Sequence, residues 1–248
     1  MRRKIRMIGL SVFCFLLVSS IVSLTFLYTE ASSPPKTIKI GGAVSFTGRF
    51  ASGGLESKFG YEQAVADINK EGGVFVKEFN KQIPMELIIE DDESDSTKCV
   101  ARLEKMHSVD KVVAYLGPYG STLCAAAGGI AEKNRVPILA VSFSLLAPHQ
   151  QGYKYLFSPF VKTDTGLEAI FATIDTIPKA QRPSTVAIFA EKTDWGEELI
   201  RLTPDIAKKQ GYTVVADKSY AVGTKDYSSL IIAAKSINAE IVIGVPTP

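Results

Sequence analysis

The feature that most constrains the fold is a regular alternation between short apolar runs and longer segments with helical spacing. The runs "TIKIGGAV", "IPMELIIE", "KVVAYL" and "VPILAV" are rich in β-branched residues, and each is followed by a polar loop and then, for the first three, by a helix-like segment. A second series starts with "STVAIFAE" and reaches "EIVIGV". Strands with continuous apolar runs are typical of parallel sheets covered by helices on both faces. The sequence therefore predicts an α/β fold with two doubly wound parallel sheets.

The aromatic segment 152–165 separates the two series and contains Pro159, which breaks the alternation. We interpret this segment as a crossover between two lobes. The predicted organisation is a first lobe over residues 37–155 and a second lobe over residues 156–248. A polar linker that contains two prolines, residues 32–36, precedes the first lobe.

The helix predicted over Leu55–Asn69 has Phe59, Ala66 and Ile68 at helical spacing. A later helix is predicted for "STKCVARLEKMHSV", after a run of acids. Asp95 and the serine that follows it are both suitable N-caps for that helix.

Residues 1–31 are predicted to be a signal peptide or an N-terminal anchor. Four basic residues within the first six precede an apolar stretch, Met7–Tyr28, and small residues flank Glu30 at a suitable cleavage position. The apolar stretch is long enough that an uncleaved membrane anchor is the alternative. In both cases the globular part is expected to be exported, in the periplasm or at the cell surface.

The body of the chain is close to electrically neutral, because residues 32–248 hold 24 Lys and Arg against 25 Asp and Glu. Such a balance gives no basis for a nucleic-acid-binding surface. Cys99 and Cys124 remain after the leader, and either a disulfide or two separate buried thiols is possible, the second being favoured. His107 and His149 stand alone, so neither a metal nor another cofactor is expected.

Motifs for nucleotide binding and catalysis are missing from the strand-to-helix loops. The chain has no GxxxxGK[ST], GxGxxG or GxSxG pattern. The acidic run 90–95 could be a metal site or an acid–base pair, but a solvated strand end that favours the next helix is the preferred interpretation. The protein is therefore not expected to be an enzyme.

The loop "GPYGST" is the strongest candidate for ligand binding. Ser121 and Thr122 come where a helix is predicted to begin, and the unpaired N–H groups there attract a carboxylate. Gly117 and Gly120 allow the backbone to approach a ligand closely. The alternative is that Ser121 only caps the helix.

Two further positions could complete this site. Ser142 and Ser144 lie on one face if the strand conformation continues, and could add hydroxyls to the same cup. Trp195, the only tryptophan, follows a strand of the second series and could cover a ligand. Ordinary loop polarity and half-buried packing are the respective alternatives.

Several quoted segments, in order, resemble one protein family: "IKIGGAVSFTGRFASGG", "GYEQAVADINKEGG", "YLGPYGS", "IAEKNRVPILAVSFS" and "STVAIFAEKTDWGEEL". Together they are similar to the type 1 periplasmic solute-binding proteins, in particular the branched-chain amino-acid binding proteins of ABC importers. The resemblance covers residues 37–248. It implies two Rossmann-like lobes, joined by a hinge, that close on a small ligand.

The resemblance also implies roles for individual residues. Ser121 matches the carboxylate-binding serine, Ser142 matches a position that contributes a backbone carbonyl, and Ser144 matches the hydroxyl residue that binds the polar head. Trp195 matches the aromatic residue that covers the ligand from the second lobe.

Three aromatic residues are added to the predicted site. Phe50 lies in a loop that lines the pocket in many family members, and Tyr119 belongs to the same loop as Ser121. Phe143 stands where the family has a small residue, and is expected to reshape or shrink the pocket.

The implied function is that of the substrate-binding component of an ABC importer. Its partners would be a small ligand, an amino acid or related amide, and a membrane permease, and the protein would be a monomer. A membrane-anchored sensing module is the alternative. Family members continue beyond the point where this chain stops, so the second lobe is expected to be incomplete, and a non-functional truncated product is a further alternative.

Overall fold

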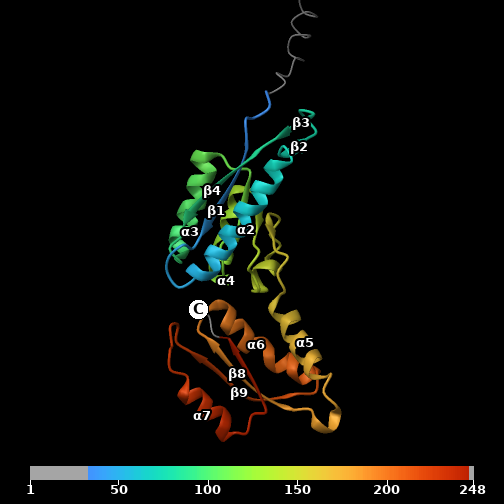
Figure 1. Cartoon of the computed structure of the whole chain (residues 1–248). Helices are drawn as coiled ribbons and strands as arrows, with labels where there is room; N and C mark the ends of the chain where they lie inside the picture. Colours follow the sequence, from blue (N-terminus) through green and yellow to red (C-terminus); the bar gives the residue numbers. More distant parts are fainter. Residues whose placement is uncertain (1–32, 246–248) are drawn as a thin grey trace, which may run out of the picture.

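The computed structural model describes residues 33–245, which form two α/β lobes stacked end to end (Figure 1). The predicted α/β fold with parallel sheets is confirmed. The expected leader, residues 1–31, lies outside the described residues, as do residues 246–248. Helices between residues 33 and 245 all fall short of the length and hydrophobicity that a bilayer crossing requires.

The first lobe is built on a five-stranded parallel sheet with the strand order β4-β1-β5-β6-β7. Ile38 lies opposite Met85 at the start of the longest pairing, between β1 and β4. The strands are β1 (Ile38–Val44), β4 (Met85–Asp91), β5 (Ala114–Leu116), β6 (Ile138–Leu139) and β7 (Leu156–Phe157). Because β7 pairs with β6, this sheet includes residues slightly beyond the predicted lobe boundary at residue 155.

Three helices cover this sheet: α2 (Ala51–Lys70), α3 (Ser96–Lys105) and α4 (Ser121–Asn134). Helix α2 lies on one side, whereas α3 and α4 pack together on the other (Figure 1). A π-helical turn, Met106–Asp110, continues α3. The core between the sheet and these helices is formed by fully buried apolar side chains that include Leu103, Tyr115, Leu123, Ile138 and Phe143.

The buried face of α2 differs from the predicted one. Phe59 is 69% exposed, and Ala66 and Ile68 also face solvent, whereas Tyr61 and Val65 are buried. Tyr61 and Val65 are four residues apart and so lie on one face of the helix. The Tyr61 hydroxyl donates a 2.8 Å hydrogen bond to the Gly117 carbonyl, which fixes this face against the end of β5.

An antiparallel hairpin, β2 (Val74–Val76) with β3 (Lys81–Ile83), follows α2 and was not predicted. Its strands are only three residues long and mostly exposed: β2 is apolar but too short to stand out as a strand, and β3 has a single apolar residue. Ile83 is its buried anchor.

The second lobe has a three-stranded parallel sheet with the order β10-β8-β9. Val186 and Ile188 of β8 face the core under α5 and α6, and the alternate residues Ala187 and Phe189 face α7. The elements are β8 (Thr185–Glu191), β9 (Thr213–Tyr220), β10 (Ile241–Val245), α5 (Thr163–Ile174), α6 (Asp194–Lys209) and α7 (Ser228–Ser236). Two short 3₁₀ helices, Ala147–Gln151 and Lys179–Gln181, lie in the connections.

Candidate ligand-binding site between the lobes

A pocket of about 500 Å³ lies between the lobes, at the carboxyl ends of both sheets. In the first sheet β1 lies between β4 and β5, so the chain leaves β1 and β5 toward opposite faces; in the second sheet β8 lies between β9 and β10. Ligands of open α/β sheets bind at such switch points. Loops from these strands, together with the start of α5, line the pocket: Phe50, Tyr119, Gly120, Ser121, Thr122, Ser142, Ser144, Phe160, Val161, Lys162, Thr163, Gly166, Leu167, Ile170, Thr193, Trp195, Leu199, Ile243 and Gly244.

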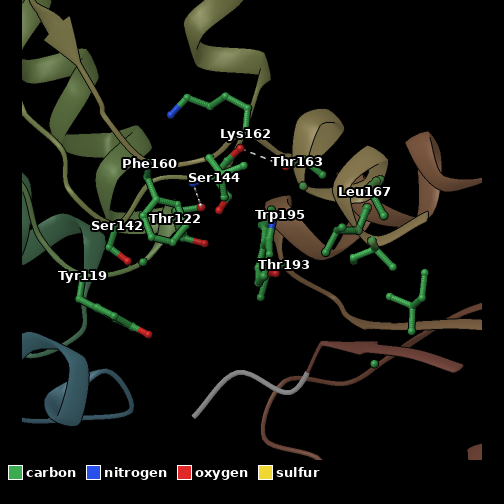
Figure 2. A pocket seen from close by; sticks show the side chains of 18 of the residues that line it. Tyr119, Thr122, Ser142, Ser144, Phe160, Lys162, Thr163, Leu167, Thr193 and Trp195 are labelled. Carbon is green, nitrogen blue, oxygen red and sulfur yellow. Dashed lines mark hydrogen bonds between the residues drawn. The ribbon is translucent and has the colours of Figure 1, made fainter. Parts of the chain in front are cut away.

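Seven of the eight predicted site residues line this one pocket, although they come from loops far apart in the sequence. Figure 2 shows Thr122, Ser142 and Ser144 on one side of the cavity and Trp195 and Thr193 on the other. The pocket thus brings together hydroxyl groups of the first lobe and the tryptophan of the second.

The Ser121 hydroxyl is held in a defined hydrogen-bonding state. Its oxygen accepts hydrogen bonds from the backbone N–H groups of Ser144 (3.2 Å) and Leu145 (3.3 Å). A hydroxyl has two acceptor lone pairs and one proton, so these bonds occupy both lone pairs and leave only the proton. The Ser121 hydroxyl, which lines the pocket, is therefore left as a hydrogen-bond donor.

The first turn of α4 provides a second attraction for an acceptor group. Its N-cap is Gly120, with φ 93°, a backbone conformation that favours glycine, and no side chain caps this helix end. The first N–H groups of a helix have no intrahelical partners and carry the positive end of its dipole. The alternative in which Ser121 only caps the helix is wrong. Ser121 is the first residue of α4, and its hydroxyl accepts hydrogen bonds from the loop after β6.

The loop after β6 alternates its side chains between the pocket and the core. Ser142 and Ser144 line the pocket, as their parity predicts, whereas Phe143 is fully buried in the first-lobe core, beside the His149 ring. Phe143 is thus placed away from the predicted ligand contacts, because a residue between two pocket-facing positions faces the opposite side. The Phe143 ring fills the core instead of narrowing the cavity.

Trp195 covers the pocket from the second lobe. It lies in the first turn of α6, whose N-cap Thr193 accepts a 3.1 Å hydrogen bond from the Gly196 N–H. The indole is partly buried and contacts the cores of both lobes. Its Nε1–H is shielded from solvent and has no hydrogen-bond acceptor among residues 33–245. A ligand in the pocket could supply that acceptor.

The start of α5 is the part of the site that the sequence analysis missed. Lys162, Thr163, Leu167 and Ile170 line the pocket, and α5 itself was not predicted. Thr163 joins the two lobes here, because both its N–H and its hydroxyl donate 3.0 Å hydrogen bonds to the Ser144 carbonyl. The segment "VKTDTG" could have predicted this helix, because a polar run after Pro159 is typical of the start of a helix.

Two acids of the second lobe bind residues of the first lobe. Glu191, 4% exposed, forms a 2.6 Å ion pair with Arg49 and accepts a hydrogen bond from the Gly223 N–H. Glu198, also 4% exposed, accepts hydrogen bonds from the N–H groups of Leu146 (2.7 Å) and Ala147 (3.1 Å). Both carboxylates therefore hold the lobes together, and neither lines the cavity.

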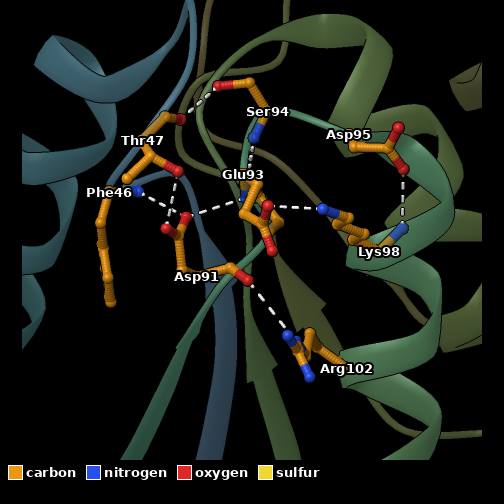
Figure 3. A network of polar contacts seen from close by, with 9 residues as sticks. Phe46, Thr47, Asp91, Glu93, Ser94, Asp95, Lys98 and Arg102 are labelled. Atoms are coloured by element: carbon orange, nitrogen blue, oxygen red, sulfur yellow. Dashed lines mark hydrogen bonds and ion pairs between the residues drawn. The ribbon is translucent and has the colours of Figure 1, made fainter.

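The acidic run 90–95 has a structural role (Figure 3), but it is not the fully solvated strand end of the preferred interpretation, because Asp92 is buried and accepts a hydrogen bond from the Ser45 hydroxyl. Asp91 accepts hydrogen bonds from the N–H groups of Phe46 and Glu93 (2.8 Å each) and from the Thr47 hydroxyl. Burial acts to raise the pKa of Asp91, but these hydrogen bonds outweigh it and hold the pKa below its ordinary value.

The rest of the acidic loop serves the neighbouring elements. Asp95 caps α3 by accepting a 2.9 Å hydrogen bond from the Lys98 N–H, which confirms one of the two predicted N-caps. The Ser94 hydroxyl accepts a 3.0 Å hydrogen bond from the N–H of Phe50. The loop therefore fixes the position from which Phe50 reaches the pocket. No group of acids, histidines and cysteines within residues 33–245 has the arrangement of a metal site.

Cys99 and Cys124 are both buried and unbridged, as the favoured alternative predicts. Burial raises the pKa of each thiol, so both are protonated at neutral pH. The Cys124 thiol donates to the Pro118 carbonyl at 3.1 Å and thereby supports the loop that carries Tyr119.

Comparison with known proteins agrees with this architecture. A family model described as "Periplasmic binding protein" matches residues 37–248. Leu/Ile/Val-binding protein homolog 7 of Brucella abortus (strain 2308) is 25% identical over 230 residues, which are 90% of this chain and 56% of that protein. The Leu/Ile/Val-binding protein of Escherichia coli (strain K12) is 28% identical over 208 residues, 83% of this chain and 53% of that protein. The chain spans about half the length of these curated relatives.

Solved structures show the same fold. The branched-chain amino acid transporter substrate-binding protein LivJ of Streptococcus pneumoniae, in complex with isoleucine, aligns with a TM-score of 0.70 and 24% identity over 84% of this chain and 57% of its own. A solute-binding protein of R. palustris in complex with benzoate aligns with a TM-score of 0.69 and 18% identity, over 85% of this chain and 55% of its own. With the family model matched over nearly all of the described residues, the chain belongs to the periplasmic binding protein family.

Proposed function

We propose that this protein is the extracytoplasmic substrate-binding component of an ABC importer. It would hold a small ligand with a carboxylate or amide head group, such as an amino acid or related amide, between its lobes. The observation that carries the proposal is one cavity, lined by the Ser121 hydroxyl and the start of α4 from the first lobe and by Trp195 from the second.

The mechanism is a shift in the equilibrium between open and closed lobes. The hydroxyls and helix N-terminus of the first lobe bind the head group, while Trp195, Leu167 and Ile170 of the second lobe cover the rest of the ligand. A ligand that contacts both lobes binds the closed form better and so increases its population. The chemistry proposed for this site is binding.

The relatives support the transport role. The curated relatives carry names that indicate leucine, isoleucine and valine binding, and the solved relatives include ABC transporter substrate-binding proteins. A permease that recognises the closed form would be the partner in the membrane. Export of the chain is proposed on the same family basis.

The proposal is tested by titrating the purified chain with the twenty amino acids and small amides while following Trp195 emission. A saturable change with one ligand class supports the proposal. Ser121→Ala should weaken that binding by about 10- to 100-fold, because it removes a hydrogen bond to a charged or strongly polar group. Ser108→Ala is the control: its hydroxyl donates a hydrogen bond to the Glu104 carbonyl, and Ser108 does not line the pocket.

A flat response to every carboxylate and amide from a chain that is folded by circular dichroism would contradict the proposal. Equal losses in Ser121→Ala and Ser108→Ala would also contradict it, since the effect would then reflect general stability.

A further inference from the structure

We propose that Arg49 and Glu191 form an ionic latch that sets how far the two lobes close in the absence of a ligand. Arg49 belongs to the loop between β1 and α2 of the first lobe, and Glu191 is the last residue of β8 in the second lobe. The latch would regulate access to the pocket, so its biological meaning rests on the proposed function, whereas its effect on the lobes can be measured without any ligand.

The ion pair is well defined on its acidic side. One carboxylate oxygen of Glu191 lies 2.6 Å from a guanidinium nitrogen of Arg49, and the other accepts a 3.1 Å hydrogen bond from the Gly223 N–H. The Glu191 side chain is only 5% exposed. A buried carboxylate is costly unless a positive charge and hydrogen bonds replace its hydration. Separation of the lobes would take Arg49 away from this carboxylate, so the pair favours the closed arrangement.

The basic side of the pair is held in place within the first lobe. The Arg49 guanidinium lies over the Phe50 ring, with its central carbon 4.7 Å from the ring centroid, a distance at which a cation is attracted to the ring face. The Phe50 N–H donates a 3.0 Å hydrogen bond to the Ser94 hydroxyl, which fixes this end of the loop. Because the guanidinium is positioned by its own lobe, little conformational entropy is lost when it meets Glu191.

Both ends of the ion pair are attached to the pocket wall. Phe50, the residue after Arg49, lines the pocket. On the other side, the Glu191 carbonyl accepts a 2.7 Å hydrogen bond from the Thr193 N–H, in the turn that leads to Trp195. The pair therefore fixes the distance between the Phe50 and Trp195 sides of the cavity. Arg49 and Glu191 do not line the cavity themselves, so they act as positioning residues.

The place of the pair relative to the chain connection makes it sensitive to rotation of the lobes. Glu198 binds the loop after β6, and the Ser144 carbonyl of this loop accepts a hydrogen bond from Thr163 at the start of α5. The Glu198 contacts therefore lie beside the connection between the lobes. Arg49 and Glu191 belong to neither the connection nor this loop. Rotation about the connection would separate Arg49 from Glu191 and change the Glu198 contacts less.

The test follows lobe closure in the purified chain without ligand. Small-angle X-ray scattering reports the separation of the lobes, and the emission wavelength of Trp195, which contacts the cores of both lobes, reports its exposure to water. Sodium chloride is raised from about 0.01 M to about 1 M, over which the screening length falls from about 30 Å to about 3 Å. We expect the lobes to separate and the emission to shift to longer wavelength as the salt concentration rises.

Substitutions identify the pair that is responsible. Arg49→Met removes the charge but keeps an unbranched stem beside Phe50, and Glu191→Gln keeps an oxygen for the Gly223 N–H. At low salt each variant should increase the ratio of open to closed protein by at least about 5-fold, the upper end of the effect of an exposed ion pair. The double variant should be no more open than either single variant, since both substitutions remove the same interaction.

Two further variants separate the latch from a general effect on stability. Arg49→Lys keeps the positive charge and should stay more closed at low salt than Arg49→Met. Lys133→Met breaks a 2.6 Å ion pair with Glu104 that lies within the first lobe. This control should leave the lobe separation and its dependence on salt unchanged.

The latch is overturned if the lobe separation of the parent does not depend on salt, or if Arg49→Met and Glu191→Gln are as closed as the parent at low salt. Additive effects of these two substitutions would also overturn it, as would an equal separation in Lys133→Met. These results would leave the proposed function intact, because no ligand takes part in the measurement. The proposed function fails separately, when the ligand titration of a folded parent gives no saturable change.

Discussion

The two lobes share a helix-to-strand contact but contribute different chemistry to the pocket. In each lobe a glycine in the first turn of a helix lies against a backbone carbonyl at the end of the preceding strand: Gly54 against Ser45, and Gly196 against Glu191. These contacts fix where α2 and α6 begin. The first lobe contributes the Ser121 hydroxyl, which a hydrogen bond within the same lobe holds in place. The second lobe contributes apolar side chains to the pocket wall and the carboxylates that join the lobes.

This difference indicates that the same α/β unit can line one pocket with polar or with apolar groups by changing only its loops. The shared part is the packing of helix on strand, which depends on glycine. The variable part is the side chains that follow the strands at the switch points. Substitutions in the shared part should therefore affect folding in both lobes, and substitutions in the loops should affect binding or closure.

The largest expected effect comes from filling the shared glycine contacts. A Cβ at Gly54 would lie 1.9 Å from the Ser45 oxygen, and one at Gly196 would lie 1.9 Å from the Glu191 oxygen. Each of Gly54→Ala and Gly196→Ala should lower the free energy of unfolding by about 3 kcal/mol, because a backbone segment must move. The measurement is urea denaturation followed by circular dichroism.

Gly60→Ala is the control in the same helix as Gly54, since a Cβ there meets nothing within 4 Å. Alanine is the better helix former by about 1 kcal/mol, so this variant should be neutral or slightly more stable. A Gly54→Ala protein as stable as Gly60→Ala would show that the close contact does not constrain α2. A large effect in only one lobe would break the parallel between them.

The second largest effect is expected at the join between the lobes. Glu198→Ala leaves the Leu146 and Ala147 N–H groups without acceptors, at a cost of about 2 kcal/mol. Glu198→Gln keeps one acceptor oxygen and should lose less. The separation of the lobes, measured by small-angle X-ray scattering without ligand, should increase in the alanine variant. An unchanged scattering profile and stability would show that Glu198 does not hold the lobes together.

The smallest effect concerns pH and the first lobe. Because the folded pKa of Asp91 is lowered, its hydrogen bonds contribute stability above the ordinary pKa of 3.8, and this contribution is lost as pH falls through the folded value. Asp91→Asn should cost about 1 kcal/mol at pH 7, and the difference from the parent should shrink below pH 4. A difference that stays constant from pH 7 to pH 2 would contradict the role of the Asp91 charge.

Much of the architecture follows from local pattern, and the failures have physical causes. Continuous apolar runs identified the parallel strands, and parity placed Ser142 and Ser144 on one face. On α2 the prediction of the buried face used the apolar residues Phe59 and Ile68, which are exposed. Tertiary contacts, including the hydrogen bond from Tyr61 to Gly117, determine which face is buried. Intrinsic pattern is a weak guide where such contacts decide.

The site was predictable to the extent that it lies at strand ends. Ser121 and Trp195 follow predicted strands and line the pocket, whereas Lys162 and Thr163 enter it after β7, a strand of only two residues that the sequence analysis treated as part of the crossover. The hydrogen bonds from Ser144 and Leu145 to Ser121 join residues more than 20 positions apart, so sequence alone could not reveal them.

The fixed state of the Ser121 hydroxyl has a consequence for the order of events in time. The lone pairs of the Ser121 oxygen are already occupied by N–H groups of the first lobe, so the hydroxyl is oriented before the second lobe moves. A ligand should therefore bind first to the first lobe alone. Removing Trp195 would then shorten the lifetime of the complex while leaving the association rate nearly unchanged.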